Sequence, residues 1–301
     1  MEHITVLKQE AVTLLDLKPD SVVVDATYGA GGHAAAICER LDERGVYIGI
    51  DADETALESS FLHRQKEGPQ FHLLHSNFSQ LTELLGSLHI KRVDAILADL
   101  GWRTDQFTTG GKGFSFTSDE PLHMTYGRAE DYLFTAHDIV NGWAEEDIAN
   151  VIYGYGEERY ARKIARAIVM ERAQTPIQTA RQLALLVSAA VPKGRQPQRT
   201  HPATKTFQAL RIAVNDELGA LEKFLSDAPA VLAPGGVLAV ISFHSLEDRQ
   251  VKLAFRELAH TEHFDLLTKK PITAADQELK ENPRARSAKL RAIKRIRDLE
   301  T

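Results

Sequence analysis

Short apolar runs and stretches with helical apolar spacing alternate along the first hundred residues of the chain. Four brief runs rich in branched side chains predict buried strands, at 22–24, 46–50, 71–74 and 93–98. Three stretches with helical spacing predict helices between these strands, at 34–41, 53–66 and 81–88. Strands that alternate with helices are typical of a parallel sheet covered on both faces, so the pattern predicts a doubly wound α/β domain.

The turn after the first predicted strand is rich in glycine and predicts a nucleotide site. Gly29, Gly31 and Gly32 lie between the strand and the next helix, whose first N–H groups suit an anion. The spacing of Gly29, Gly31 and Ala34 formally fits the dinucleotide fingerprint, which leaves a nicotinamide dehydrogenase open. However, three residues separate Asp25 from Gly29, which is long for a pyrophosphate turn. An acid at that place suits a ligand with an ammonium group, such as S-adenosylmethionine.

Three predicted strands end on an acid, namely Asp25, Asp51 and Asp99. Ligands of doubly wound sheets bind at the carboxyl ends of the strands, so we expect these acids on one rim. Asp51 stands where ribose hydroxyls are held, although a helix cap is an alternative. Phe78 follows the third strand, where it would pack either on a purine ring or on the core.

The second half of the chain interrupts the sheet and then completes it. Residues 129–202 are mostly helical in pattern, and a long helix is predicted over 206–232. A fifth strand follows at 237–242, and 264–269 could pair with 289–295 as an antiparallel hairpin. We therefore predict a first core segment, an inserted helical subdomain for substrate recognition and a second core segment, at 1–104, 105–205 and 206–301.

Composition and charge narrow the class of protein. The chain of 301 residues has one cysteine, no long apolar run, no metal-ligand spacing among its histidines and a polar N-terminus, which together predict a cytoplasmic protein without metal. The net charge is −6, yet residues 159–211 carry eleven Lys/Arg against one acid, and residues 284–297 carry seven against none. Two such runs in an acidic protein favour a polyanion as partner, although a solvated face is the alternative.

Several motifs together resemble the bacterial small-subunit ribosomal RNA cytosine-N4 methyltransferases of the MraW/RsmH type. The match runs almost end to end, over HITVLKQEA (3–11), DATYGAGGH (25–33), GFSF (113–116), YGEER (155–159), HPATKTFQALR (201–211), ISFHSLEDR (241–249) and ENPRARSAKLR (281–291). The resemblance implies a seven-stranded, class I adenosylmethionine-dependent methyltransferase core with an inserted helical domain. It also implies methylation of a cytosine amine in the decoding region of the small subunit.

The family's cofactor contacts, carried over by position, fall on seven residues: Gly31, Gly32, His33, Asp51, Phe78, Asp99 and Gln106. The chain departs from the family pattern at 102–105 and at 123–127, beside the expected catalytic rim. These departures motivate an alternative, a catalytically weakened ribosome-assembly or RNA-binding protein that keeps the fold.

Three residues are candidates for catalysis. Asp99 is the best acceptor for hydrogen bonds from the target amine, or it holds the cofactor instead. Trp102, three residues after that acid, has the spacing of an aromatic that stacks on a flipped base, with packing under the insert as the alternative. His244 follows the fifth strand and would contact RNA or serve as a structural histidine.

The candidate RNA contacts are the cations of the two basic runs, with one histidine: Arg199, His201, Lys205, Arg249, Arg284, Arg286, Lys289 and Arg291. The expected partner is small-subunit ribosomal RNA or the assembled small subunit. No membrane contact is expected, and a homodimer is possible.

Overall fold

The computed structural model describes residues 4–64, 67–101, 111–192 and 201–298. The chain divides into two compact units, which are described separately. The core unit comprises Met1–Trp102 and Leu218–Thr301, and the insert comprises Arg103–Glu217. Within the described ranges, none of the helices combines the length and the apolar character needed to cross a membrane.

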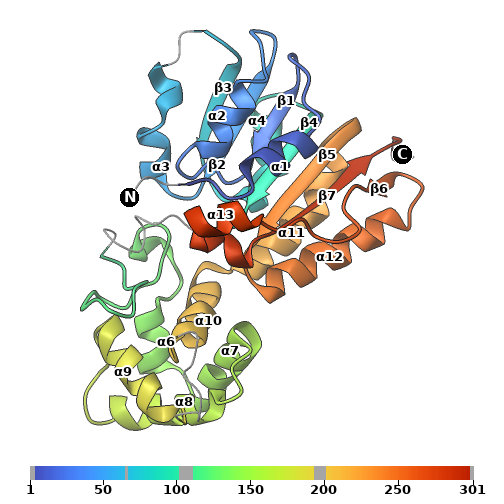
Figure 1. The fold of residues 1–301 in the computed structure, drawn as a ribbon. Coiled ribbons are helices and arrows are strands. Elements are labelled where there is room, and N and C mark those ends of the chain that lie inside the picture. The colour runs from blue at the N-terminus through green and yellow to red at the C-terminus, as the bar shows by residue number, and fades with distance from the viewer. Residues whose placement is uncertain (1–3, 65–66, 102–110, 193–200, 299–301) are drawn as a thin grey trace. The chain divides into compact units, whose positions relative to one another are not determined.

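The core unit is built on a seven-stranded sheet with the strand order β3-β2-β1-β4-β5-β7-β6 (Figure 1). The strands are β1 (Val22–Asp25), β2 (Val46–Asp51), β3 (Gln70–His75), β4 (Val93–Asp99), β5 (Leu232–Ser242), β6 (Phe264–Leu266) and β7 (Lys289–Arg295). The first five strands are parallel, whereas β7 is antiparallel to both β5 and β6. The predicted doubly wound sheet and its antiparallel end are therefore confirmed.

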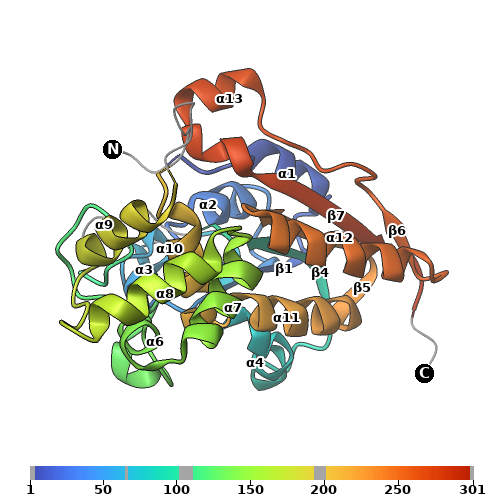
Figure 2. The same cartoon turned by 90° about the horizontal axis from the view of Figure 1, so that it is seen from below.

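Alternating side chains of the strands build one hydrophobic layer on each face of the sheet. Val23 and Tyr47 belong to the layer that includes α1 (Lys8–Leu14) and α2 (Gly32–Cys38). Val24 and Ile48 belong to the layer that includes α4 (Leu81–Ser87), α11 (Glu217–Val231) and α12 (Ser245–Ala259). This division follows from the two-residue period of a strand. Figure 2 shows α1 and α2 on one side of β1 and β4, and α4 and α11 on the other.

The helices of the core unit are mostly short. They are α1 (Lys8–Leu14), α2 (Gly32–Cys38), α3 (Glu54–Glu58), α4 (Leu81–Ser87), α11 (Glu217–Val231), α12 (Ser245–Ala259) and α13 (Asp276–Glu281). Three 3₁₀ turns accompany them, η1 (Phe61–Arg64), η2 (Phe78–Gln80) and η4 (Pro283–Ser287). The helix predicted over 53–66 is thus a single short helix, α3, followed by η1.

The insert has a hydrophobic core of its own, formed by helices that pack on one another. They are α6 (Ala136–Gly142), α7 (Glu145–Gly156), α8 (Ala161–Arg172), α9 (Ala180–Ala190) and α10 (Thr204–Asn215), with a 3₁₀ turn η3 (Ala129–Asp131). Ile152, Ile164, Leu183 and Leu210 are fully buried in this core. Across the described residues of the insert, the regular secondary structure is therefore helical, as the sequence predicts.

The long helix predicted over 206–232 is in fact two helices. Asp216 adopts a left-handed conformation with φ 46° and ends α10, and α11 begins at the next residue. Phe207, Leu210 and Val214 of α10 pack into the core of the insert. The insert consequently ends at Glu217 rather than at 205, the boundary that the sequence suggests.

Candidate active site

The glycine loop after β1 has a backbone that only glycine adopts easily. Gly29 and Gly31 have φ values of 57° and 78°, in the left-handed region. A Cβ atom on Gly31 would lie 2.7 Å from the hydroxyl oxygen of Tyr28, so the loop has no room for a side chain there. A Cβ atom on Gly32 would lie 1.7 Å from Oγ1 of Thr5. Thr5 of the N-terminal segment therefore packs directly against the glycine loop.

Asp51, at the end of β2, stabilises the glycine loop. Its Oδ2 atom accepts the backbone N–H of Gly29 at 2.7 Å, and its Oδ1 atom accepts the N–H of Asp53 at 2.8 Å. Asp51 remains partly exposed. The structure thus places the carboxylate at the predicted rim and gives it a structural role in the loop; its contact with ribose hydroxyls stays a prediction.

Asp25 differs from the other strand-tip acids because it is buried, with 1% of its surface exposed. The Tyr47 hydroxyl donates to Oδ2 of Asp25 at 2.8 Å, and the Thr27 N–H donates to Oδ1 at 3.3 Å. Burial raises the pKa of Asp25 to about 6; these two hydrogen bonds oppose the shift and the charge of Asp51 adds to it. Asp25 thus ends β1 at the predicted rim, but its burial contradicts the expectation that it could meet an ammonium group there.

Asp99 ends β4 on the other side of β1 from Asp51, and its side chain keeps 20% of its surface exposed. Its N–H donates to Oγ1 of Thr27 at 2.6 Å, and its Oδ1 atom accepts the N–H of Gly101 at 3.2 Å. Burial raises the pKa of Asp99 to about 7, against the effect of the Gly101 hydrogen bond and with help from the charges of Asp25 and Glu247. Asp99 can therefore change its protonation state near neutral pH.

His33 connects the glycine loop to the tip of β4. It lies in the first turn of α2 and is 5% exposed, and its Nδ1 atom lies 3.6 Å from Oδ2 of Asp99. The strand order changes direction at this place, because β2 and β4 flank β1 on opposite sides. Such a switch point is where doubly wound sheets bind ligands. The predicted residues His33, Asp51 and Asp99 therefore meet around one loop.

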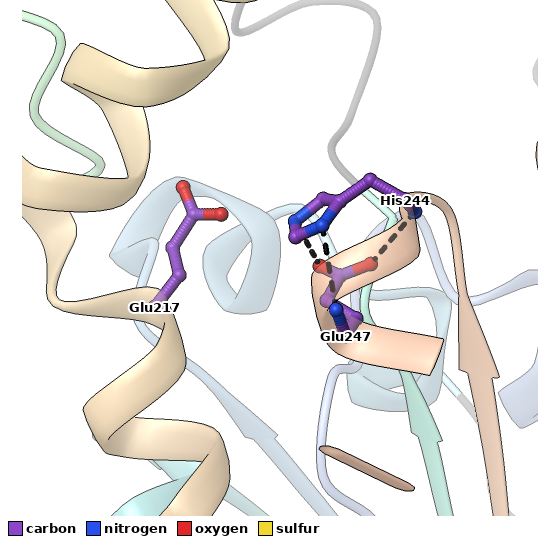
Figure 3. Close-up of side chains that lie close together, drawn as sticks. All are labelled: Glu217, His244 and Glu247. Carbon is purple, nitrogen blue, oxygen red and sulfur yellow. Dashed lines mark hydrogen bonds and ion pairs between the residues drawn. The ribbon is translucent and has the colours of Figure 1, made fainter. Parts of the chain in front are cut away.

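The turn between β5 and α12 forms another part of this rim. The Phe243 ring packs so closely on Gly101 that a Cβ atom there would lie 2.8 Å from it. His244 is the N-cap of α12, and its Nδ1 atom accepts the N–H of Glu247 at 3.4 Å (Figure 3). Glu247 accepts the N–H groups of Phe243 and His244 at 2.8 and 3.2 Å, and its Oε1 atom lies 3.1 Å from Nε2 of His244.

These contacts give His244 a capping role in the structure, while its role in catalysis remains a prediction. Glu247, which is 4% exposed, was not among the predicted site residues. The spacing of a cap residue and a glutamate three positions later is a recognised helix-start signal, and it could have identified the pair. Thr27, which binds the backbone of Asp99, carried no comparable sequence signal.

Phe78 begins η2 and is half-buried. Its ring packs edge-on against Phe224 of α11, with centroids 5.3 Å apart and an interplanar angle of 78°. The core packing considered from the sequence is thus present. Because part of Phe78 stays exposed, the structure leaves room for the predicted contact with a purine ring.

The basic residues near the C-terminus fall into two groups. Oδ1 of Asp248 accepts a hydrogen bond from Nε of Arg291 at 2.7 Å, and Oδ2 of Asp248 accepts one from Nζ of Lys289 at 2.8 Å. Burial raises the pKa of Asp248, but the hydrogen bonds from Arg291 and Lys289 outweigh it and hold the pKa below its usual range. Arg291 is 8% exposed, so it joins β7 to α12 rather than facing solvent. By contrast, Arg249 and Arg286 are exposed and Arg284 is half-buried.

Two predicted RNA contacts lie in the described part of the insert. The exposed His201 ring stacks on Phe116, with centroids 4.4 Å apart, and its Nδ1 atom accepts the N–H of Ala203. Lys205 is exposed and its Nζ atom donates to the carbonyl oxygen of Glu157. Trp102, Gln106 and Arg199 lie outside the described residues, and their predicted roles stay predictions.

The residues of the core unit fit S-adenosylmethionine, the predicted cofactor. Gly29 and Gly31 hold left-handed φ angles at the switch point, and Gly29 is partly exposed there. Two partly exposed carboxylates, Asp51 and Asp99, lie on the strands that flank this loop. Carboxylates of this kind suit the hydroxyl and ammonium groups of the cofactor. On binding, S-adenosylmethionine would supply an electrophilic methyl group, and these residues would hold it.

Comparison with known proteins agrees with this geometry. The family model described as the MraW methylase family matches residues 1–296. A protein of Syntrophotalea carbinolica named Ribosomal RNA small subunit methyltransferase H is 45% identical over 310 residues, covering 98% of each chain. A protein of the same name from Clostridioides difficile is 38% identical, and the match covers 98% of this chain and 99% of the Clostridioides difficile protein. The chain therefore belongs to the MraW methylase family and is a class I methyltransferase whose cofactor is S-adenosyl-L-methionine.

Proposed function

We propose that the protein methylates the exocyclic N4 amine of a cytosine in the decoding region of small-subunit ribosomal RNA. The relatives carry the name of a small-subunit ribosomal RNA methyltransferase, which supports this class of substrate. The observation that carries the proposal is the Asp99 carboxyl, with a pKa of about 7, at the switch point beside the glycine loop.

The chemistry explains why a carboxylate is needed there. The lone pair of a cytosine amine is delocalised into the ring, so the amine is a weak nucleophile. In its charged form, Asp99 accepts a hydrogen bond from the amine and favours the pyramidal nitrogen that attacks the methyl group. Bound S-adenosylmethionine would supply the methyl group and remain as S-adenosylhomocysteine, and the amine would lose its surplus proton to Asp99 or water. Positioning and electrostatics of this kind supply large parts of many enzymatic rate enhancements.

Other residues complete the proposed site. Trp102 would stack on the flipped base, and the exposed Arg249 and Arg286 would contact phosphates. His201 would contact RNA from the insert, which we propose to be the substrate-recognition subdomain.

The departures at 102–105 and 123–127 favour a second candidate, an assembly or RNA-binding protein with weakened catalysis. The second departure includes Met124, which has φ 59° and is 1% exposed, and Thr125, which is also 1% exposed. These two side chains fill the interior of the insert, so their exchange concerns packing of the insert. Substitutions in the interior of the insert give little support to weakened catalysis, the second candidate function.

Methyl transfer to purified subunits tests the proposal. The protein is incubated with tritiated-methyl S-adenosylmethionine and small subunits from a strain without the endogenous enzyme, and the labelled nucleoside is identified by mass. We expect N4-methylcytidine with the natural protein and about 100-fold less or lower, in the same time, with the Asp99→Asn variant. Label in another nucleoside would overturn the proposed substrate. Absence of label, with cofactor binding shown by calorimetry, would favour the assembly factor.

A further inference from the structure

We infer that the exposed cations at the start of α8 form a docking surface for the phosphate backbone of the RNA substrate. The surface consists of Arg159, Arg162, Lys163 and Arg166 and is called the α8 basic face below. This inference rests on the proposed function and deepens it, because it names where the insert would hold the RNA. None of these four residues was singled out as a contact from the sequence.

The four side chains are exposed and follow the spacing of one helix stripe. Arg162, Lys163 and Arg166 lie in α8, where residues three and four apart are neighbours on the surface. Arg159 precedes the helix, and its guanidinium carbon lies 4.6 Å from the centroid of the Tyr160 ring. Four positive charges therefore line one short strip of the insert.

No carboxylate in the described part of the chain forms an ion pair with the α8 basic face. The nearest acid in the sequence before it, Glu158, is 8% exposed and accepts the N–H of Tyr160 at 2.8 Å. Two other cations of the insert, by contrast, have structural partners. Arg172 binds the carbonyls of Val140 and Trp143, and Arg211 binds Glu217.

The position of these charges is unfavourable for the helix itself. The N-terminal end of a helix carries a partial positive charge, so cations in its first turn lower helix stability. α7 follows the usual rule with Glu145, Glu146 and Asp147 in its first turn, whereas the first turn of α8 has no acid and contains Arg162 and Lys163. Like charges at Arg162 and Arg166, four residues apart, add repulsion.

A local arrangement that opposes stability and lacks an internal partner points to an external ligand. An anion removes both penalties at once, because it neutralises the repulsion and suits the helix N-terminus. In a protein of net charge −6, a strip of four cations that form no ion pair among the described residues is complementary to a polyanion. Among polyanions, RNA is the one that the proposed reaction supplies.

The test compares two charge reversals of equal size and spacing. The first is Arg162→Glu with Arg166→Glu on the α8 basic face. The control is Arg40→Glu with Arg44→Glu, two exposed residues just before β2, at the amino ends of the strands and thus opposite the rim. Binding of naked small-subunit ribosomal RNA and of small subunits is measured from 50 to 250 mM KCl, alongside thermal unfolding and S-adenosylmethionine affinity.

We expect the α8 reversal to weaken RNA binding about tenfold or more. The slope of the logarithm of the binding constant against the logarithm of the KCl concentration should become less steep by about 1.4, the value for two lost phosphate contacts to single-stranded RNA. Its unfolding temperature should stay equal or rise, since acids suit a helix N-terminus, and its cofactor affinity should not change. The control should bind RNA as the natural protein does.

Equal RNA affinity and equal salt slope in the α8 reversal and the control would overturn the inference. A loss seen with small subunits and not with naked RNA would also overturn it, because the partner would then be a ribosomal protein. These outcomes are distinct from failure of the proposed function, which would appear as absence of N4-methylcytidine with the unaltered protein.

Discussion

The Nδ1 atom of His33 lies 3.6 Å from the Oδ2 atom of Asp99, and this contact links the glycine loop to the tip of β4. The two residues are distant in sequence, and the parallel sheet brings them together at its switch point. Because the Asp99 carboxyl has a pKa of about 7, it is largely protonated in mildly acidic solution and largely charged above neutral pH. Its proposed role as an acceptor requires the charged form.

The pH dependence of turnover should therefore report Asp99. We expect single-turnover methyl transfer to rise as the pH increases through about 7, with the Asp99→Asn variant slower by about 100-fold or more and without this rise. Calorimetry of cofactor binding serves as the control. A variant that keeps full turnover at saturating cofactor and only binds the cofactor more weakly would show that Asp99 holds the cofactor and does not act on the amine.

The contact between Gly32 and Thr5 predicts a coupled pair. Gly32→Ala would place a Cβ atom 1.7 Å from Oγ1 of Thr5, so we expect a loss of about 1–3 kcal/mol in the free energy of unfolding. Thr5→Ala removes Oγ1 and should recover part of the loss in the double variant. Urea unfolding of the four proteins gives the coupling energy. Additive effects would mean that the N-terminal segment moves away from the loop without cost.

The buried Asp25 predicts a pH dependence of stability. Its folded pKa of about 6 lies above the unfolded value of 3.8, so the folded state keeps a proton that the unfolded state releases. Stability should fall by up to about 3 kcal/mol as the pH rises from about 4 to about 6, and then level off. Asp25→Asn should flatten this part of the curve, measured by urea unfolding at each pH.

Asp99 provides the comparison for this measurement. Its raised pKa also makes stability fall with rising pH, and the fall continues to about pH 7. Asp99→Asn should therefore reduce the slope from about pH 4 to about pH 7, whereas Asp25→Asn should reduce it only from about pH 4 to about pH 6. An Asp25→Asn variant with the unaltered slope between pH 4 and 6 would refute the assignment.

The capping contacts of His244 allow its two roles to be separated. Serine is a good N-cap residue and alanine a poor one, so His244→Ala should lose about 1 kcal/mol of stability and His244→Ser much less. Since both ring nitrogens of His244 face Glu247, we expect His244→Ser to keep turnover within a few-fold of the unaltered enzyme. A stable His244→Ser protein without activity would instead restore the catalytic role suggested by the sequence.

The sequence is most informative where local pattern decides the structure. The strands β1 to β4 follow from their apolar runs, and the position of Asp51 and Asp99 follows from the rule that parallel strands end at one edge. The glycine loop is recognisable because its φ angles at Gly29 and Gly31 demand glycine. These features suffice to predict the fold and to place Asp51 and Asp99 beside the glycine loop at the switch point.

The features that the sequence does not reveal depend on partners that are distant along the chain. Asp25 is at a strand tip like Asp51, but Tyr47 of the neighbouring strand covers it. The break at Asp216 has neither glycine nor proline, and apolar spacing continues across it. The charge run at the start of α8 is visible in the sequence, whereas the lack of ion-pair partners among the described residues requires the structure.

Arg291 and Arg286 should respond differently to the same substitution, although both were expected to bind phosphate. Arg291→Met leaves the buried Asp248 with Lys289 alone, so we expect a loss of about 3 kcal/mol in the free energy of unfolding. Arg286→Met removes an exposed charge, so stability should change by less than about 0.5 kcal/mol while RNA affinity falls and its salt dependence flattens. Urea unfolding and RNA binding of both variants check this contrast. An Arg291→Met protein as stable as the unaltered one, with reduced RNA affinity, would show that Arg291 leaves Asp248 to reach the RNA.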